Sequence, residues 1–318
     1  MFNLNFTELN PISIADQIKK NGYFIIENAL TTEYIDQLLK EIDFERTLVN
    51  SNDVGVVLSG NQKFLTYCLA KSKKVYDIVT YDKVLDICQE YFPDKYKLVN
   101  NRICYTAINM HMPWHTDNNI QSDDKLIGKH DFLGLQFIFY LTSVKESPFQ
   151  YIKDSHIWSS EYDEIYLGDD FVNSNYKESI ITFEMNKGGL IICNTHGFHR
   201  AKPFQNLNHS RTILSFQVDE VNSKNVGHGE RNLINPEYVD KPTKKILDYL
   251  GFGARADYPS FPVTSLANMH LEDIFRLQRQ LFPLTLRALL KTVAKAILPD
   301  KFIIDLKRIA WRSRDISS

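Results

Sequence analysis

The residues best suited to chemistry lie in the segment 112–117. An imidazole and a carboxylate stand two positions apart there, at His115 and Asp117. The segment follows a predicted strand at residues 102–109, and in an extended chain residues i and i+2 point to the same face. These two side chains can therefore hold one metal ion from one side. Two histidines and one carboxylate on a single face of iron(II), with the other positions open, form the ligand set of non-heme oxygenases. A third ligand must come from elsewhere in the chain.

A second polar segment supplies candidates for that ligand. Residues 190–194 have the composition of a strand and lead into Thr195-His196-Gly197-Phe198-His199-Arg200. A barrel that brings these strand ends together sets His199 opposite the first two ligands, whereas His196 is an alternative ligand or a residue lining the pocket. A His-x-Asp pair alone is expected by chance about once in a chain of this size, so the interpretation depends on this context.

An arginine follows at a useful distance. Arg211 opens the next predicted strand, so it is expected one strand away from the ligands and directed inward. Its planar guanidinium can bind a carboxylate through two parallel hydrogen bonds, which suits it to anchor a carboxylate co-substrate.

The elements that must position these residues are mostly strands. A helical brace with one strand is expected at 14–45 and a helical region at 64–91. Short strands without regularly intervening helices favour an antiparallel barrel or sandwich. The polar loop 118–131 directly follows the first two ligands, as a lid would. The expected strands are 23–26, 102–109, 134–141, 149–153, 179–183, 190–194 and 211–218.

The sequence pattern changes in the C-terminal part from strands to helices. We therefore divide the chain into a catalytic unit at 1–220 and a helical extension at 221–318. A short helix at 244–250 ends at Gly251, and two amphipathic helices are expected over 284–318, separated at Pro299-Asp300. This stretch has eight Lys or Arg against three Asp. Its helices are expected to pack on the barrel, to pair in a homo-oligomer, or to rest on an anionic membrane surface.

Composition narrows the function classes. The 318 residues are 43% hydrophobic and 12% aromatic, which supplies a core, and a net charge of −2 does not suggest a nucleic-acid partner. The four cysteines form no CxxC pair and no disulfide ladder, which is typical of a reducing compartment. Neither a signal peptide nor an apolar run of roughly 18–20 residues is visible, so we expect a cytoplasmic protein, with peripheral membrane contact as the one variation.

Five stretches of the chain, in order, resemble the phytanoyl-CoA dioxygenase family of iron(II)- and 2-oxoglutarate-dependent oxygenases. Each stretch alone is unspecific, but the ordered set is specific and covers residues 14–220. The stretches are Asn21-Gly22-Tyr23-Phe24-Ile25-Ile26-Glu27-Asn28, Trp114-His115-Thr116-Asp117, Phe139-Tyr140-Leu141-Thr142 followed by Ser147-Pro148-Phe149, Lys153-Asp154-Ser155-His156, and Asn194-Thr195-His196-Gly197-Phe198-His199-Arg200 with Arg211 beyond it.

The resemblance implies a double-stranded β-helix, a jelly-roll or cupin-like fold. The N-terminal helical brace and the C-terminal helical extension expected from the residues flank it. It implies iron(II) held by His115, Asp117 and His199, and 2-oxoglutarate held by Arg211. Further pocket residues are expected around these, some of which could equally serve packing. They are Asn101, Tyr105 and Gln136 beside 2-oxoglutarate, with Trp114 and His196 as walls of the substrate pocket.

One departure from the family bears on the co-substrate site. Ala201 stands where many members carry a serine hydroxyl that helps to hold 2-oxoglutarate, and Thr212 or Ser215 is expected to replace that hydroxyl. Because Asp117 is neither Gly nor Ala, the chain does not resemble the branch of the family that vacates this ligand for chloride.

The sequence therefore predicts a dioxygenase that uses iron(II), 2-oxoglutarate and O₂ to hydroxylate an unactivated C–H bond of a small organic substrate, releasing succinate and CO₂. Two alternatives from other classes remain: a non-catalytic metal-binding or ligand-binding protein on the same fold, and a zinc hydrolase. The hydrolase would need an acid–base carboxylate in the pocket and would leave Arg211 without a role.

Overall fold

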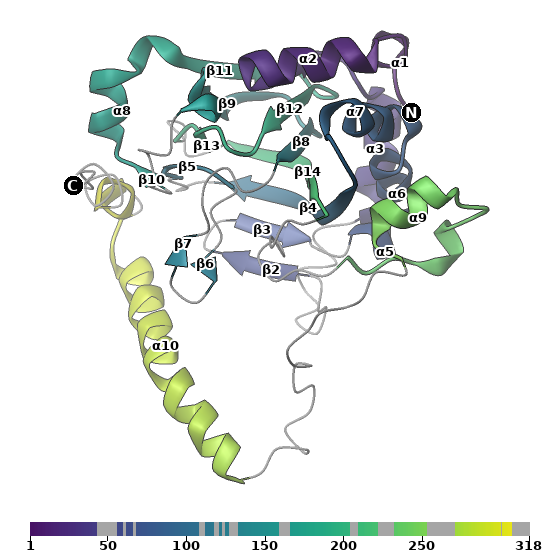
Figure 1. Ribbon diagram of the computed structural model, residues 1–318. Helices are drawn as coiled ribbons and strands as arrows, with labels where there is room; N and C mark the ends of the chain where they lie inside the picture. The colour runs from purple at the N-terminus through teal and green to yellow at the C-terminus, as the bar shows by residue number, and fades with distance from the viewer. Residues whose placement is uncertain are drawn as a thin grey trace.

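The computed structural model describes residues 1–42, 56–59, 62–65, 68–107, 112–117, 121–122, 125–126, 133–158, 166–203, 209–221, 232–252, 271–299 and 301–306. Within these ranges, two antiparallel sheets face each other and helices cover their outer sides (Figure 1). The predicted lid at 118–131 lies largely outside the described residues, apart from a small ladder of β6 (Gln121–Ser122) and β7 (Lys125–Leu126).

The larger sheet has seven strands in the order β1-β12-β8-β14-β4-β3-β2, and every pair in it is antiparallel. Its long central strands provide most of the barrel wall. The strands are β1 (Tyr23–Ile26), β2 (Val56–Ser59), β3 (Gln62–Leu65), β4 (Tyr96–Ala107), β8 (Gly134–Tyr140), β12 (Leu190–Asn194) and β14 (Ser210–Glu220).

The smaller sheet has five strands in the order β10-β5-β13-β9-β11. Two of its strands are very short and carry the predicted metal ligands. The strands are β5 (Trp114–His115), β9 (Val144–Ile152), β10 (Tyr166–Leu167), β11 (Ile180–Met185) and β13 (His199–Ala201).

Helices from both ends of the catalytic unit pack on the outer face of the larger sheet. One apolar cluster joins them to the side chains of that face, for example Leu38 and Val84 to Phe137 and Phe216. The helices are α1 (Leu4–Thr7), α2 (Pro11–Asn21), α3 (Thr32–Ile42), α5 (Cys68–Lys71), α6 (Lys73–Val79), α7 (Asp82–Tyr91) and α9 (Lys244–Leu250), whereas α8 (Asp169–Asn175) lies against the smaller sheet.

The ends of α2 follow directly from its sequence. The Asn10 side chain accepts a hydrogen bond from the Ile12 N–H, and Pro11 occupies the first turn, where no backbone donor is needed. Gly22 ends the helix with φ +84°, a left-handed conformation that glycine adopts without cost. This turn feeds the chain into β1 at the edge of the larger sheet.

A second apolar cluster lies between the two sheets and defines the inner face of each. It joins Ile138, Tyr140 and Cys193 of the larger sheet to Phe149 and Tyr151 of the smaller one. Because side chains alternate along a strand, residues two positions from these also face inward, and their immediate neighbours face outward.

The predicted strands are confirmed, with bounds that differ by a few residues. The main correction concerns 64–91, where Phe64 and Leu65 belong to strand β3 and the described helices begin at Cys68. Leu65 pairs with Ile103 on β4, so these first residues extend the larger sheet instead of starting a helix.

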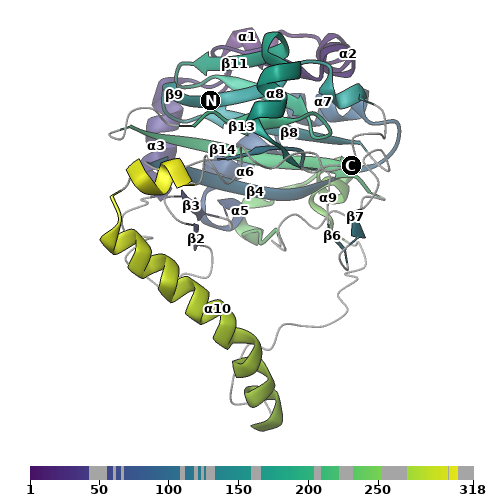
Figure 2. The ribbon, with the colours of Figure 1, turned by 90° about the vertical axis from the view of Figure 1, so that its left-hand side faces the viewer.

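The C-terminal extension divides into two parts. Residues 232–252 pack on the catalytic unit: Tyr249 and Leu250 of α9 are buried in the outer cluster, and Lys245 pairs with Asp86. Helix α10 (Leu271–Ile297) instead projects away from the sheets in both views (Figure 2). It starts well before the predicted position 284 and runs through Pro283, which costs one backbone hydrogen bond without ending the helix.

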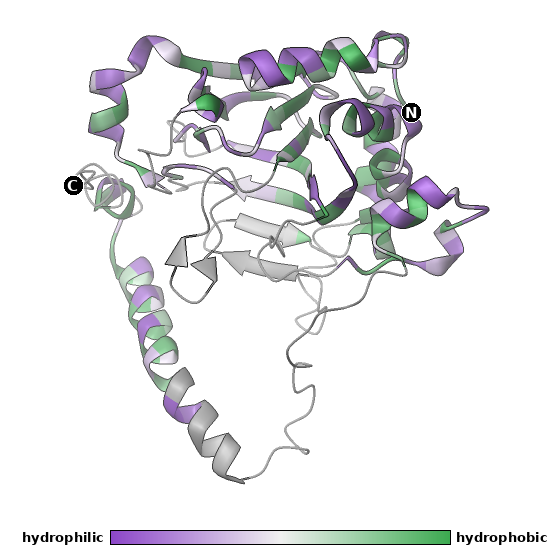
Figure 3. Cartoon of the chain, in the orientation of Figure 1, coloured by the Kyte–Doolittle hydropathy of each residue, from purple (hydrophilic) through white to green (hydrophobic). Residues whose placement is uncertain are grey.

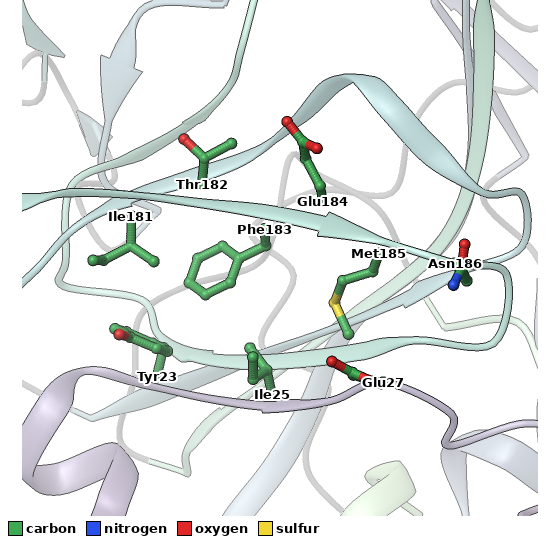
Figure 4. Close-up of a pocket in the computed structure, with 9 residues that line it drawn as sticks. All are labelled: Tyr23, Ile25, Glu27, Ile181, Thr182, Phe183, Glu184, Met185 and Asn186. Carbon is green, nitrogen blue, oxygen red and sulfur yellow. The ribbon is translucent and has the colours of Figure 1, made fainter.

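A shallow pocket of about 250 Å³ opens between the free edges of the two sheets (Figure 4). Tyr23, Ile25 and Glu27 line it on the β1 side, and residues 181–186 line it on the β11 side. None of the predicted site residues lines this pocket, so the two features are separate.

Candidate metal centre

The first two ligands are positioned by the shortest strands of the smaller sheet. β5 pairs with β10 on one side and with β13 on the other, and His115 stands directly opposite His199 in that second pairing. Asp117 follows β5, and its backbone N–H donates to the Thr195 carbonyl at 3.2 Å. The antiparallel pairing of two distant chain segments thus brings the His-x-Asp motif to His199.

The three side chains form a compact set. His199 Nε2 lies 3.3 Å from Asp117 Oδ2, and His115 Nε2 lies 3.7 Å from Asp117 Oδ1. One ligand atom from each residue can be chosen so that all lie within 4.8 Å of one another. The two imidazole centroids are 4.5 Å apart. Three donors this close, from two nitrogens and one carboxylate, can share a single cation.

Backbone carbonyls fix both imidazoles in the tautomer that metal binding requires. His115 Nδ1 lies 2.9 Å from the Pro113 carbonyl, and His199 Nδ1 lies 3.0 Å from the Gly197 carbonyl. A carbonyl can only accept, so each Nδ1 carries a proton, and Nε2, on the Asp117 side, is left as the atom that would bind a metal. A carbonyl behind each ligating histidine is the usual way in which proteins orient such ligands. The donor set therefore fits a divalent metal such as iron.

The charge of Asp117 dominates the electrostatics of the site. Burial opposes a charged His199, but the Asp117 carboxylate outweighs burial through its charge and a hydrogen bond, so the pKa of His199 is raised. A bound cation would displace that proton, because an imidazole coordinates in its neutral form. Burial, reinforced by Asp117, raises the pKa of the nearby Cys193 thiol well above its ordinary value. Cys193 therefore stays protonated and does not compete for the metal.

Arg211 lies deep between the sheets, with a relative exposure of 5%. Its Nη1 donates to the Ser147 carbonyl on β9, and two residues along that strand the Phe149 ring stacks on His199 at 5.2 Å. Burial lowers the pKa of the Arg211 guanidinium, although a guanidinium remains protonated at neutral pH. Its Nε has no hydrogen-bond partner among the described residues. A buried cation with an unused donor, one aromatic ring away from the metal ligands, is suited to receive an anion.

The strand register decides which of the remaining pocket candidates face Arg211. Gln136 lies between the outward-facing Leu135 and Phe137, and it donates to the Ser215 hydroxyl, so both polar groups are on the inner face. Ser215 is four residues from Arg211 on the same strand and therefore on the same side. Gln136 Oε1 has no partner within the described structure.

Two predicted co-substrate contacts are placed differently. Asn101 stands opposite Phe216, and Tyr105 stands opposite Thr212, all on the outer face of the larger sheet. The Asn101 amide is bonded to Asn232 of the C-terminal extension. The prediction that these residues contact 2-oxoglutarate is therefore corrected, and the same register removes Thr212 as the replacement hydroxyl and leaves Ser215.

The prediction that Trp114 lines the substrate pocket is also corrected. It precedes His115 on β5 and so points to the opposite side, where it is fully buried between the smaller sheet and α8 with Leu167 and Val172. The Arg200 guanidinium lies over its ring at 4.3 Å and is held in turn by Asp169. Trp114 therefore anchors the ligand strand from behind and does not line the pocket.

The pairing of β5 with β13 brings only one of the two candidate third ligands opposite His115. His199 stands opposite His115, whereas His196 lies in the preceding turn, where its backbone N–H donates to the Asn194 side chain. His196 is buried beside the site, as a lining residue would be.

Sequence reasoning missed the residues that hold this turn. The Asn194 amide donates to the Tyr91 hydroxyl at 2.8 Å, tying the turn to helix α7. Gly197 packs so closely on Tyr151 that an added Cβ would lie 1.8 Å from the phenolic oxygen. The available signal was the glycine itself, two residues before the ligand, where a close backbone approach favours that residue.

Comparison with known proteins agrees with this geometry. A family model described as phytanoyl-CoA dioxygenase (PhyH) matches residues 18–213, which is more than half of the chain. The chain belongs to the phytanoyl-CoA dioxygenase family. This PhyH chain is thus a 2-oxoglutarate-dependent, non-heme iron enzyme, and its His-Asp-His set could hold a metal ion. No curated protein matches the chain as a whole.

Solved structures share the double-stranded β-helix at low identity. The carbocyclase SnoK from nogalamycin biosynthesis has a TM-score of 0.52 and 13% identity, covering 68% of this chain and 86% of its own. The epimerase SnoN, in complex with Fe³⁺, alpha-ketoglutarate and nogalamycin RO, has a TM-score of 0.51 and 14% identity, covering 66% of this chain and 83% of its own. HygX from Streptomyces hygroscopicus, with nickel, 2-oxoglutarate and hygromycin B bound, has a TM-score of 0.50 and 13% identity, covering 66% of this chain and 87% of its own. At these identities the likeness establishes the fold.

Proposed function

We propose that this PhyH chain hydroxylates an unactivated C–H bond of a small organic substrate, with iron(II) on His115, Asp117 and His199. The observation that supports it best is the pair of imidazoles whose Nδ1 atoms face backbone carbonyls and whose Nε2 atoms face Asp117. With iron, 2-oxoglutarate and O₂ bound, the net reaction converts C–H to C–OH and releases succinate and CO₂.

In this proposal Arg211 binds the distal carboxylate of 2-oxoglutarate. The guanidinium is already desolvated, and it donates to the Ser147 carbonyl on the same strand whose Phe149 ring stacks on His199. A dry site strengthens the pairing with an incoming carboxylate, because fewer water dipoles screen it. Gln136 and Ser215 supply polar contacts along the same inner wall, and Ser215 takes the place of the hydroxyl absent at Ala201.

The contribution of the protein is positional. The inner-face aromatics, including Tyr140 and Phe149, exclude water around the metal ligands, and the histidines are held in one tautomer. No side chain is required as a general base, because the co-substrate and the metal supply the chemistry. The reaction class is open to variation on this fold, since SnoN is an epimerase and SnoK a carbocyclase.

The alternatives account for less of the structure. A zinc hydrolase would use the same three ligands but would leave the buried charge of Arg211 unexplained. A non-catalytic binding protein would not need three oriented metal ligands together with a desolvated arginine. We assign residues 1–252 to the catalytic unit, because α9 packs on it. We also propose a reducing cytoplasmic setting, because all four cysteines are buried thiols.

The experiment that tests the proposal is an anaerobic reconstitution with iron(II) and 2-oxoglutarate, followed by exposure to O₂. We expect a visible charge-transfer band before oxygen and succinate afterwards, even from slow turnover without the primary substrate. Zinc in place of iron should give neither. Absence of both signals from a folded, iron-loaded protein would refute an oxygenase function.

A further inference from the structure

Helix α10 exposes a continuous apolar face. Many of its large hydrophobic side chains are exposed: Leu289 is 58% exposed, Leu290 61% and Ile297 73%. Within the described part of the chain nothing covers them, and the helix projects from the sheets in two perpendicular views (Figures 1 and 2). Leaving this much apolar surface in water is unfavourable, so we expect another surface to cover this face.

Six exposed apolar residues of α10 follow the period of one helix face, whereas Leu284, also exposed, lies on the opposite side among the cations. Successive residues are separated by about 100° around the axis, which places the set within a stripe about 100° wide. Figure 3 shows the resulting alternation of hydrophobic and hydrophilic residues along the helix. The stripe consists of Phe282, Leu286, Leu289, Leu290, Val293 and Ile297, all of them exposed.

A row of cations runs along the other side of the same helix. Arg287, Lys291 and Lys295 are spaced four residues apart, so they form one line on a face turned away from the apolar stripe. All three are exposed. The sequence has five Lys or Arg and no Asp or Glu between positions 274 and 299, so no acidic side chain of the helix neutralises this row.

The charge pattern selects among the surfaces that would cover the stripe. In helix pairs, the residues flanking the apolar seam are usually acidic and basic, and they attract across the interface. Two copies of α10 that paired through their stripes would leave both basic rows in water, so these charges would not attract across the interface. An anionic lipid surface instead accepts the apolar stripe among its acyl chains and pairs the basic row with its headgroups.

We propose that α10 lies flat on an anionic phospholipid surface and holds the catalytic unit there. No described helix combines the length and apolarity needed to cross a bilayer, so the mode is a peripheral one. The apolar stripe enters the headgroup boundary, and the three cations on the polar face are attracted to the anionic headgroups, which their long side chains can reach. This proposal does not depend on the iron site, since α10 contributes none of the ligands.

The test is sedimentation of the full chain with vesicles of phosphatidylcholine alone or mixed with phosphatidylglycerol, at low and at high salt. We expect binding to the anionic vesicles that weakens in high salt, and little binding to phosphatidylcholine alone. A Lys or Arg near such a surface contributes about fivefold in affinity. The Arg287→Gln/Lys291→Gln/Lys295→Gln variant should therefore bind about a hundredfold more weakly.

A matched control removes the same number of charges elsewhere. Lys40, Lys145 and Lys177 are exposed on the catalytic unit, and their triple change to Gln should leave vesicle binding within a few-fold of the original. A second variant, Leu289→Gln/Leu290→Gln, removes part of the apolar stripe and should also lose binding, while 2-oxoglutarate-dependent succinate formation stays unchanged.

Three results would overturn the proposal. The full chain could remain in the supernatant with anionic vesicles at low salt. The control triple could weaken binding as much as the α10 triple, which would make the attraction a property of total charge. Sedimentation velocity could show a dimer that the Leu289→Gln/Leu290→Gln variant dissociates, which would make the stripe an interface between two copies of this chain.

Discussion

Replacing Arg211 by leucine is the most informative change at the proposed co-substrate site. The side chain is 5% exposed and bonded to the Ser147 carbonyl, so the substitution keeps much of its volume while removing a desolvated charge. Breaking a buried ion pair by deleting one partner typically costs about 3–5 kcal/mol. That range corresponds to a loss of 2-oxoglutarate affinity of roughly a hundredfold to several thousandfold. Iron(II) affinity should change little, because Arg211 is not a ligand.

The assay is an anaerobic titration of the iron-loaded protein with 2-oxoglutarate, following the charge-transfer band, with thermal unfolding as a check on the fold. Arg211→Lys should retain part of the affinity, since it restores the charge but not the two-pronged geometry. Arg200→Leu is the control, because Arg200 binds Asp169 on the outer side of the smaller sheet. An unchanged titration for Arg211→Leu would refute the assignment, and Arg102, which shares the inner face opposite Ser215, would be tested next.

Two further outcomes test how the site is built. Gly197→Ala places a Cβ 1.8 Å from the Tyr151 hydroxyl, and since such overpacking costs about 1–3 kcal/mol, we expect a lower melting temperature and weaker iron binding in equilibrium dialysis. Iron affinity equal to that of the original would show that this turn does not position the ligands. Burial raises the pKa of both Cys88 and Cys193, so both should resist alkylation at pH 8 until denaturant is added, as mass spectrometry of the labelled peptides would show. Rapid labelling of either in the folded protein would contradict the buried placement.

The three residues of the His-Asp-His set could be singled out from the sequence because their signals are local. His115 and Asp117 carry their spacing in the sequence, and His199 follows a strand that can be recognised from its composition. The choice between His196 and His199 needed the pairing of β5 with β13, which is a long-range contact. The strand bounds were also close, since the turns between them contain recognisable residues such as Gly188.

The facing of the pocket residues was harder to predict for a physical reason. Every residue of β8 is buried, because helices cover one side of the larger sheet and the second sheet covers the other. Such a strand lacks the alternation of polar and apolar residues that marks an inner face. Asn101 and Tyr105 were misplaced on β4 for this reason. Trp114 could have been placed correctly, since the residue before an inward-facing His115 in a strand must face outward.

The contacts that orient the histidines leave almost no trace in a sequence. The carbonyls of Pro113 and Gly197 are backbone atoms, which every residue has, so only the folded geometry shows that they face an imidazole. Helix α10 was misjudged at its start because proline usually interrupts a helix, and Pro283 does not do so here.

The most direct test of the central claim is iron(II) binding by the full chain and by Asp117→Ala, measured by anaerobic equilibrium dialysis in the presence of 2-oxoglutarate. The carboxylate lies within 3.3 Å of His199 and 3.7 Å of His115, so removing it takes one of three ligands from a set that cannot replace it locally. We predict that the original chain binds one equivalent of iron. In the folded Asp117→Ala variant the iron affinity should fall by more than about a hundredfold, because losing a ligand costs more than losing a residue that supports one. Iron bound by Asp117→Ala with the original affinity and stoichiometry would contradict the assignment of His115, Asp117 and His199 as the metal centre.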